Sequence, residues 1–516
     1  MGKETRCRFE IPPDPVPKYR IAETREAEVV VIGAGTAGLV CANSAAEHGA
    51  RVILISASSF PVARGGSNHA INSKLTRELG INYDVGKNVK REIDRAGGRI
   101  DQDKWFLFAR KSGEAMDWLI DKMVAAGLKP VVEMTWEDPD DIMSAFPGAH
   151  GFIRPNMKTT GASQMLVVKT LANLAQKAGV QIHYNAIAEQ LVRENNNTGR
   201  VTAVIARDSE ERYIKYVGSK AVVLATGDFS RDREMVAKYC PEVLPLVDTA
   251  PINYNDKYRR GGGVYAGDGH KMGLWVGAAW QRTIPNAPMM IGGPGPESRP
   301  YSGFRGLMVN GDAERFCSED INKTHLAFIQ MRQPGMKVFA IWNKEYAQRM
   351  APWFPFGSYI GSPEKPVTDV VKEWEKNVES GTMIKADTID NLARKFGLDP
   401  RKLKATTDRY NAFCEAGEDE DYFKRSGLLF PILKGPFYGQ ISNRPWLLIV
   451  CGGLRCNQKM QVLDTRDRII PGLYVVGTIV GDIFANYYSF VPSGIHYGAT
   501  CITFGYLVGK EAATSD

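Results

Sequence analysis

Short apolar runs rich in β-branched residues alternate with helical patterns near the start of the chain. Residues 27–32 form an apolar run that predicts a buried strand, residues 39–48 have a helical pattern, and residues 51–56 predict a second strand. This order predicts a parallel strand pair joined by a right-handed crossover. The pattern therefore favours an α/β fold with a Rossmann-type parallel sheet.

Strand and helix patterns return farther along the chain. We expect helices at 103–126 and 163–178, a strand at 181–184 and an antiparallel pair through 200–216. Residues 222–227 and 472–477 each predict a buried strand that ends in a glycine turn, and 494–510 predicts a final helix.

The composition changes character between about residues 285 and 445, where Pro/Gly-rich loops, aromatic patches and polar helices gather. We expect an N-terminal extension at 1–26, a nucleotide-binding domain at 27–284, an inserted α+β capping domain at 285–445, and the return of the nucleotide-binding domain at 446–516.

A glycine motif lies between the first predicted strand and helix. Gly33, Gly35 and Gly38 flank Thr36 and Ala37 in a GxGxxG pattern, which permits a tight turn and close approach of a pyrophosphate to a helix N-terminus. The second strand ends in Ser56 and Ala57, where an acidic residue normally holds the ribose hydroxyls. We expect a weaker or shared ribose contact there.

Composition and charge narrow the function classes. Of the 516 residues, 44% are hydrophobic and 24% charged, as in an ordinary globular protein with two or more domains. The 65 Lys and Arg residues are interspersed with 58 Asp and Glu, so we expect no nucleic-acid partner. The first twenty residues lack the apolar core of a secretion signal, and no run suits a membrane helix, so we expect a cytoplasmic protein without direct membrane insertion. The eight cysteines are scattered, and we expect no metal site.

Further motifs follow the order found in flavoprotein subunits of fumarate reductase and succinate dehydrogenase. They are Gly65-Gly66-Ser67-Asn68, Gly161-Ala162-Ser163, Leu224 to Phe229, Gly267 to Gly273, Arg315-Phe316, Cys451 to Leu454 and Pro471 to Tyr474. The chain resembles that family from about residue 28 to 512, and its segment 498–506 is also similar to the end of the ketosteroid dehydrogenases.

The resemblance implies FAD as the cofactor. It implies that the ADP half lies on the glycine motif, with Ala188 near the adenine. The loop 65–68 and Asp268 would lie near the isoalloxazine and ribityl chain, and the first N–H groups of the final helix would face the N1/C2=O edge, where they stabilise the charge gained on reduction. The expected cofactor residues are Gly33, Gly35, Thr36, Ala37, Gly38, Ser56, Ala57, Gly65, Gly66, Ser67, Asn68, Ala188, Ala225, Thr226, Gly227, Asp268, Gly477, Asp482, Ser493, Gly494 and Ile495.

Two departures from the family concern attachment and substrate. Succinate dehydrogenases bind FAD covalently through a histidine six residues before the Gly-Gly pair, and Ser59 stands there, so we expect non-covalent FAD. No arginine lies between Arg468 and Lys510, and the family's substrate histidine is replaced within 447–451. Two groups that bind dicarboxylates are therefore missing, and we do not expect fumarate or succinate as substrate.

Several residues are candidates for proton transfer. Counting from Arg315 places Lys323 where the family has its proton-donating arginine, although Lys323 also suits a surface loop, and Thr324 or His325 remain alternatives. Tyr487 and Tyr488 are candidates because a phenol can donate to a carbonyl oxygen, but they also suit an aromatic wall that packs the flavin.

His496 and Tyr497 rank second, since a histidine there also suits a buried, hydrogen-bonded site. The tyrosine position of the ketosteroid enzymes is occupied by Phe490.

We therefore expect an FAD-dependent oxidoreductase that reduces or forms a C=C bond next to a carbonyl, on an apolar or cyclic small molecule. With no haem or cluster motif, it needs an external electron donor or acceptor. The alternatives are an electron-relay subunit of a redox complex and a flavin-binding protein without turnover.

Overall fold

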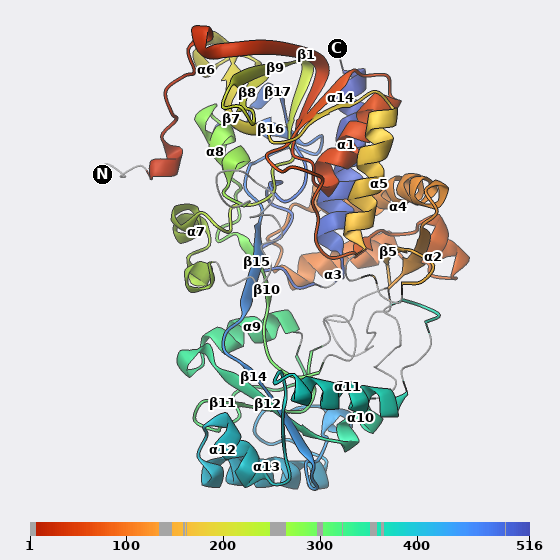
Figure 1. The fold of residues 1–516 in the computed structure, drawn as a ribbon, viewed down its shortest axis with the longest axis vertical. Helices are drawn as coiled ribbons and strands as arrows, with labels where there is room; N and C mark the ends of the chain where they lie inside the picture. The colour runs from red at the N-terminus through yellow and green to blue at the C-terminus, as the bar shows by residue number, and fades with distance from the viewer. Residues whose placement is uncertain are drawn as a thin grey trace. The chain divides into compact units, whose positions relative to one another are not determined.

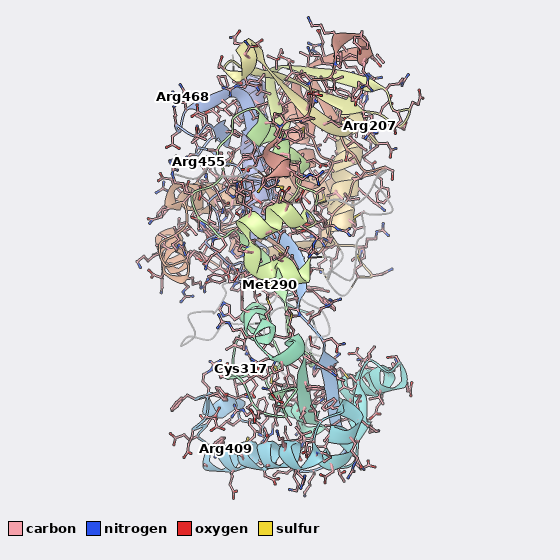
Figure 2. The ribbon with its side chains drawn as sticks, turned by 90° about the vertical axis from the view of Figure 1, so that its left-hand side faces the viewer. Arg207, Met290, Cys317, Arg409, Arg455 and Arg468 are labelled. Atoms are coloured by element: carbon pink, nitrogen blue, oxygen red, sulfur yellow. The ribbon has the colours of Figure 1, made fainter. Side chains whose placement is uncertain are left out.

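The structure is a computed structural model in which the chain divides into two compact units. It describes residues 7–133, 147–157, 160, 163–247, 265–296, 303–321, 323–350, 359–362, 366–490 and 492–515. The first unit comprises Met1–Glu133, Phe146–Met289 and Leu447–Asp516, and the second comprises Met134–Ala145 and Met290–Trp446. Met290, the first residue of the long segment of the second unit, is labelled in Figure 2. The corresponding boundaries expected from the sequence were 285 and 445.

The first unit is built on an eight-stranded sheet. Its order is β16-β17-β9-β1-β2-β6, with β8 paired to β9 and β7 paired to β8. The strands are β1 (Ile21–Ile32), β2 (Val52–Ile55), β6 (Gln181–His183), β7 (Ile187–Arg193), β8 (Val201–Arg207), β9 (Tyr213–Leu224), β16 (Gln461–Leu463) and β17 (Ile469–Val475). The neighbours β17, β9, β1, β2 and β6 are parallel. The expected α/β fold with a parallel sheet is confirmed.

Three helices lie side by side against this sheet (Figure 1). They are α1 (Thr36–Glu47), α5 (Gln164–Lys177) and α14 (Phe504–Thr514). Glycine lets α14 approach α1, because a Cβ on Gly509 would lie 2.4 Å from the carbonyl oxygen of Cys41. The beginning and the end of the chain therefore share one layer.

The first strand is longer than the sequence pattern predicted. β1 begins at Ile21, which pairs with Tyr213 of β9, so the last residues of the expected N-terminal extension belong to the sheet. Their side chains are mostly exposed, and Arg25 pairs with Glu23 at 2.7 Å. Apolar patterning detected only the buried half of the strand, because backbone pairing does not require apolar side chains.

The remaining elements of the first unit surround the sheet. They are η1 (Arg8–Glu10), η2 (Lys18–Arg20), β3 (Asn68–His69), α2 (Lys74–Glu78), α3 (Val85–Arg95), α4 (Gln102–Ala125), β4 (Lys129–Val132), β5 (Ala149–Ile153), α6 (Glu194–Asn197), α7 (Arg233–Tyr239), η3 (Pro241–Leu246) and α8 (Asp268–Trp275). The strands β3, β5 and β4 form a separate antiparallel sheet.

The final helix is not a uniform α-helix. A π-helix, η7 (His496–Thr503), precedes α14. The Thr503 hydroxyl donates to the carbonyl of Gly498, five residues back, at 2.7 Å. The predicted start at residue 494 is also displaced, because Gly494 has a φ of +73° and lies outside the helix. Insertions of this kind occur frequently at functional sites.

The second unit is an α+β structure around an antiparallel sheet of order β11-β12-β14-β13. Its elements are β11 (Leu307–Asn310), α9 (Lys323–Met331), η4 (Pro334–Met336), β12 (Val338–Asn343), α10 (Glu345–Arg349), α11 (Val367–Glu379), β13 (Ile384–Ala386), α12 (Ile389–Phe396), α13 (Pro400–Ala416), η6 (Ser426–Leu428) and β14 (Phe437–Ser442). One apolar cluster contains Trp342 and Trp374, and another contains Phe339 and Phe396.

The boundaries between the units fall within two paired strands, β10 (Ala287–Ile291) and β15 (Trp446–Cys451). Among the described residues, no helix has the length and apolar character needed to cross a membrane.

Candidate active site

The turn after β1 joins the ends of three parallel strands. The Gly33 N–H donates to Ile55 O at 2.8 Å, and the Ala225 N–H donates to Ile32 O at 2.9 Å. Gly33 has a φ of +118°, and a Cβ there would lie 2.3 Å from Ala225 O. Only glycine can make this turn at such close contact.

The other two glycines of the motif have different surroundings. A Cβ on Gly38 would lie 1.9 Å from Gly33 O, so Gly38 lets α1 pack against the turn. At Gly35 the nearest atom to a Cβ would be Val62 O at 3.8 Å, which leaves this side of the turn open. Gly35 is also the N-cap of α1 and has no side chain to cap the first turn, so its N–H groups can bind a phosphate.

The expected ribose and adenine residues lie near the end of β2. The Ser56 hydroxyl is 2.8 Å from the Ser58 hydroxyl, and Ser56 O accepts a hydrogen bond from the Ala186 N–H at 2.9 Å. Ala188 follows two residues later in β7, and Ala57 directly follows Ser56. The structure therefore brings these residues together.

The segment after β9 lies against the start of α8. A Cβ on Gly269 would lie 2.0 Å from Thr226 Oγ1, which places Asp268 beside the segment Ala225 to Gly227. Thr226 Oγ1 is buried and has no hydrogen-bond partner among the described residues. An unpaired hydroxyl at this point is available to a bound polar group.

The loop that contains Gly65 and Gly66 packs directly against the segment before η7. A Cβ on Gly494 would lie 2.5 Å from the carbonyl carbon of Ser67, and the His69 N–H donates to Gly494 O at 3.0 Å. Gly65 has a φ of +69° and faces open space, whereas a Cβ on Gly66 would lie 1.8 Å from Thr160 O. Two segments more than 400 residues apart thus form one surface.

Glu133 joins these two segments and was not identified from the sequence. Its buried carboxylate accepts hydrogen bonds from the hydroxyls of Ser67 (2.8 Å), Ser493 (3.3 Å) and Thr160. Burial raises the pKa of Glu133 although these hydroxyls oppose the rise. Glu133 directly follows β4 and belongs to no motif, so the sequence carried no signal for it.

The donor set suits an FAD. The fit rests on the open side of Gly35, the uncapped helix N-terminus, and buried polar atoms without partners in the described structure, namely Asn68 Oδ1, Ser163 Oγ and Thr226 Oγ1. No group of three His, Cys, Asp or Glu side chains that could hold a metal occurs in the described part of the chain.

Two expected cofactor residues have structural contacts of their own. The Gly477 N–H donates to Thr500 O at 2.7 Å, at the end of β17. The Asp482 carboxylate accepts hydrogen bonds from the N–H groups of Arg282 and Thr283, each at 2.9 Å. These bonds hold a loop in place, and contact between Asp482 and the cofactor stays a prediction.

Two of the expected catalytic residues of the first unit, Tyr497 and His496, form side-chain hydrogen bonds outside the pocket described below. The Tyr497 hydroxyl donates to Arg64 O at 2.8 Å, and burial raises its pKa. His496 Nε2 lies 2.8 Å from the Thr478 hydroxyl, and burial lowers the pKa of the imidazole to about 4. Both contacts suit structural roles.

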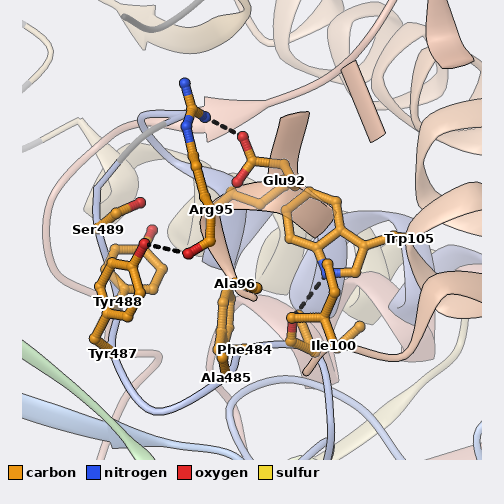
Figure 3. Close-up of a pocket in the computed structure, with 12 residues that line it drawn as sticks. Glu92, Arg95, Ala96, Ile100, Trp105, Phe484, Ala485, Tyr487, Tyr488 and Ser489 are labelled. Atoms are coloured by element: carbon orange, nitrogen blue, oxygen red, sulfur yellow. Dashed lines mark hydrogen bonds and ion pairs between the residues drawn. The ribbon is translucent and has the colours of Figure 1, made fainter. Parts of the chain in front are cut away.

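Tyr487 and Tyr488 line a pocket in the first unit (Figure 3). The Tyr487 hydroxyl donates to Arg95 O at 3.0 Å, and the Tyr488 hydroxyl accepts from the His496 N–H at 3.3 Å. Other lining residues are Glu92, Arg95, Trp105, Phe484 and Ile495. Lys323 begins α9 in the second unit, and its side chain lies outside the described structure.

The chain is similar in sequence to a known protein family and to several characterised enzymes. A family model described as an FAD binding domain matches residues 28–490. A vinyl phenol reductase of Lactiplantibacillus plantarum is 26% identical over 94% of this chain and 95% of its own length. A fumarate reductase (cytochrome) of Shewanella frigidimarina is 26% identical over 94% of this chain and 77% of its own length.

A solved structure of 3-ketosteroid-Δ4-(5α)-dehydrogenase from Rhodococcus jostii has a TM-score of 0.70 at 22% identity, and covers 97% of this chain and 100% of that chain. The resemblance to fumarate reductases and ketosteroid dehydrogenases is confirmed.

Proposed function

The chain belongs to the FAD binding domain family and is an FAD-dependent oxidoreductase, and we propose that its reaction is the two-electron reduction of a carbon–carbon double bond in an uncharged cyclic or aromatic substrate. Bound FAD supplies the hydride. Relatives named as vinyl phenol, urocanate and fumarate reductases support C=C reduction.

One geometric observation carries the proposal. The two segments expected around the isoalloxazine, Gly65 to Asn68 and Ser493 to Ile495, are in direct contact, and the second segment also reaches the aromatic pocket. Ile495 lines that pocket, and Tyr488 links it to the start of η7 through the His496 N–H. A substrate in the pocket would thus lie beside the flavin-binding surface.

The chemistry of the pocket favours an uncharged substrate. The segment from Ile469 to Gly509 contains no arginine or lysine, and four aromatic rings line the pocket. The guanidinium of Arg95 is already paired with the Glu92 carboxylate. A substrate carboxylate would have to compete with Glu92 for the guanidinium, whereas an apolar ring would pack against the aromatic walls.

Tyr487 can hold the proton that the second carbon requires. Burial raises the pKa of its phenol, and the neighbouring Glu92 raises it further, so the hydroxyl remains protonated at neutral pH. The hydrogen bond from the hydroxyl to Arg95 O fixes the direction of the phenol. We also propose Tyr488 and Lys323 as alternative donors, and an external electron donor that reduces the flavin.

Anaerobic rapid-mixing spectroscopy tests this function. Protein reduced with dithionite is mixed with 4-vinylphenol, cyclohexenone or fumarate, and flavin reoxidation is followed in the visible band. We expect an uncharged acceptor to reoxidise the flavin at least about 100-fold faster than fumarate, because a missing bidentate arginine contact costs several kcal/mol. Faster reoxidation by fumarate would contradict the substrate class, and no reoxidation by any acceptor would favour the electron-relay alternative.

We propose further that the FAD is not covalently bound. Ser59, at the place of the linking histidine, is exposed and cannot form the histidyl bond. Precipitation with acid should leave the yellow flavin in the supernatant. Colour retained in the washed pellet would show a covalent bond.

A further inference from the structure

Aromatic rings form much of the pocket wall, and two of them also form hydrogen bonds to the backbone. Trp105 Nε1 donates to Ile483 O at 2.7 Å, and the Tyr487 hydroxyl donates to Arg95 O. Figure 3 shows Tyr487 and Tyr488 on one side of the pocket and Trp105 on the other. These walls suit a flat ring.

An ion pair between Glu92 and Arg95 also lines the pocket. Glu92 and Arg95 are bonded to each other, and their side chains are only 11% and 4% exposed. The carboxylate accepts hydrogen bonds and the guanidinium donates them. A buried ion pair that lines a pocket therefore offers a ligand a hydrogen-bond acceptor and a hydrogen-bond donor side by side.

We propose that the pocket binds a phenol ring of the substrate and that the Glu92–Arg95 pair recognises its hydroxyl group, an inference that rests on the proposed function and names the substrate class. A phenol hydroxyl donates to a carboxylate and accepts from a guanidinium, so it satisfies both partners. A ring without the hydroxyl would remove water from the pair without replacing its hydrogen bonds.

The position of the pocket agrees with this role. Ile495 forms part of its wall, directly after the Ser493–Gly494 segment that contacts the loop at Ser67. Glu92 and Arg95 belong to the end of α3, whereas Tyr487 and Tyr488 precede η7. A phenol held by the pair at one end would therefore have its substituent available to the flavin-binding surface.

Binding of non-reactive ligands tests the proposal independently of turnover. Calorimetry on the oxidised holoenzyme compares 4-ethylphenol with ethylbenzene, which differ only in the hydroxyl. We expect 4-ethylphenol to bind at least about tenfold more tightly, and Glu92→Gln to remove most of that difference while ethylbenzene binding changes less than about twofold. Equal affinities in the natural enzyme, or an unchanged ratio in Glu92→Gln, would overturn the proposal.

Two further variants control the experiment. Asp94→Asn makes the same charge change on an exposed side chain of α3 and should keep the ratio. Ala96→Phe fills the pocket and should weaken both ligands by at least about tenfold. Unchanged 4-ethylphenol binding in Ala96→Phe would place the phenol elsewhere, and this result does not depend on whether Glu92→Gln folds.

The two proposals fail in different ways. Retained 4-ethylphenol binding without reduction of 4-vinylphenol would contradict the reaction and leave the pocket assignment intact. Reduction of 4-vinylphenol that is unaffected by Glu92→Gln would contradict the assignment and leave the reaction intact.

Discussion

Each unit of the molecule buries a glutamate against an arginine that is close in the sequence, and the two pairs differ in their partners. In the second unit, Arg315 bonds Glu319 at 2.9 Å and Asp419 at 2.8 Å, and Lys424 lies 3.4 Å from Glu319. Two cations and two anions thus balance one another. Burial would raise the pKa of Asp419, but its hydrogen bonds with Arg315 and Lys424 N–H lower it to about 2.

In the first unit, Glu92 and Arg95 are paired with each other and line a pocket. Burial raises the pKa of Glu92 to about 7 although Arg95 opposes the rise. The buried charges of the second unit stabilise that unit. In the first unit, the Glu92 carboxyl group can change its protonation state near neutral pH, which is typical of groups that bind a ligand.

The largest expected loss of stability follows a substitution in the buried cluster of the second unit, which consists of Arg315, Glu319, Asp419 and Lys424. Arg315→Met leaves Glu319 and Asp419 buried beside a single lysine, so we expect a loss of about 3–5 kcal/mol in the free energy of unfolding. Urea unfolding of the holoenzyme measures it.

The control for this substitution is Arg409→Met, which breaks an exposed ion pair with Asp421 in the same unit (Figure 2). It should cost less than about 1 kcal/mol. Similar losses in the two variants would mean that the buried cluster is no more important than a surface pair.

Glu133 is a third buried acid, and it has hydroxyl partners instead of a cation. Glu133→Leu leaves the hydroxyls of Ser67, Thr160 and Ser493 without their acceptor, and we expect a loss of about 2–3 kcal/mol and weaker FAD binding. Glu133→Gln keeps the shape and should lose less. If Glu133 positions the flavin-binding segments, Glu133→Gln also shifts the flavin reduction potential in a spectroelectrochemical titration. A variant with lower stability and an unchanged potential would limit Glu133 to a structural role.

The sequence was most informative where the backbone itself makes the site. Gly33 and Gly38 could be predicted because local turn geometry and close packing demand glycine at these positions. The pocket gave no such signal, because Glu92 and Tyr487 come from segments almost 400 residues apart and no spacing connects them. Glu133 was missed for the same reason, and the π-helix η7 was missed because apolar patterning does not distinguish it from an α-helix.

The pH dependence of stability should separate the two ion pairs further. The pKa of Glu92 in the folded state, about 7, lies above the ordinary value of 4.5, so its contribution is fully present below about pH 4.5 and is lost as the pH rises through 7. Arg95, Arg91 and Tyr487 are the charged or titratable groups that act on it. We expect Glu92→Gln to remove about 1–2 kcal/mol of this decline, since solvent in the pocket screens the charge. Unfolding midpoints from pH 5 to 8 measure the slope, and an unchanged slope would contradict the assigned pKa.

A small expected change in stability at Tyr497 distinguishes it from the tyrosines of the pocket. Tyr497→Phe removes the hydrogen bond to Arg64 O, and we expect a cost of about 1 kcal/mol in stability with kcat unchanged within about twofold. A tyrosine that transfers a proton contributes about 100-fold or more to the rate, so Tyr487→Phe should lower kcat by at least that factor. The phenols differ in location, because Tyr487 lines the pocket and Tyr497 bonds the backbone beside the glycine loop. If Tyr497→Phe instead produces the larger loss of kcat, the proton path runs along the glycine loop, and the pocket has only a binding role.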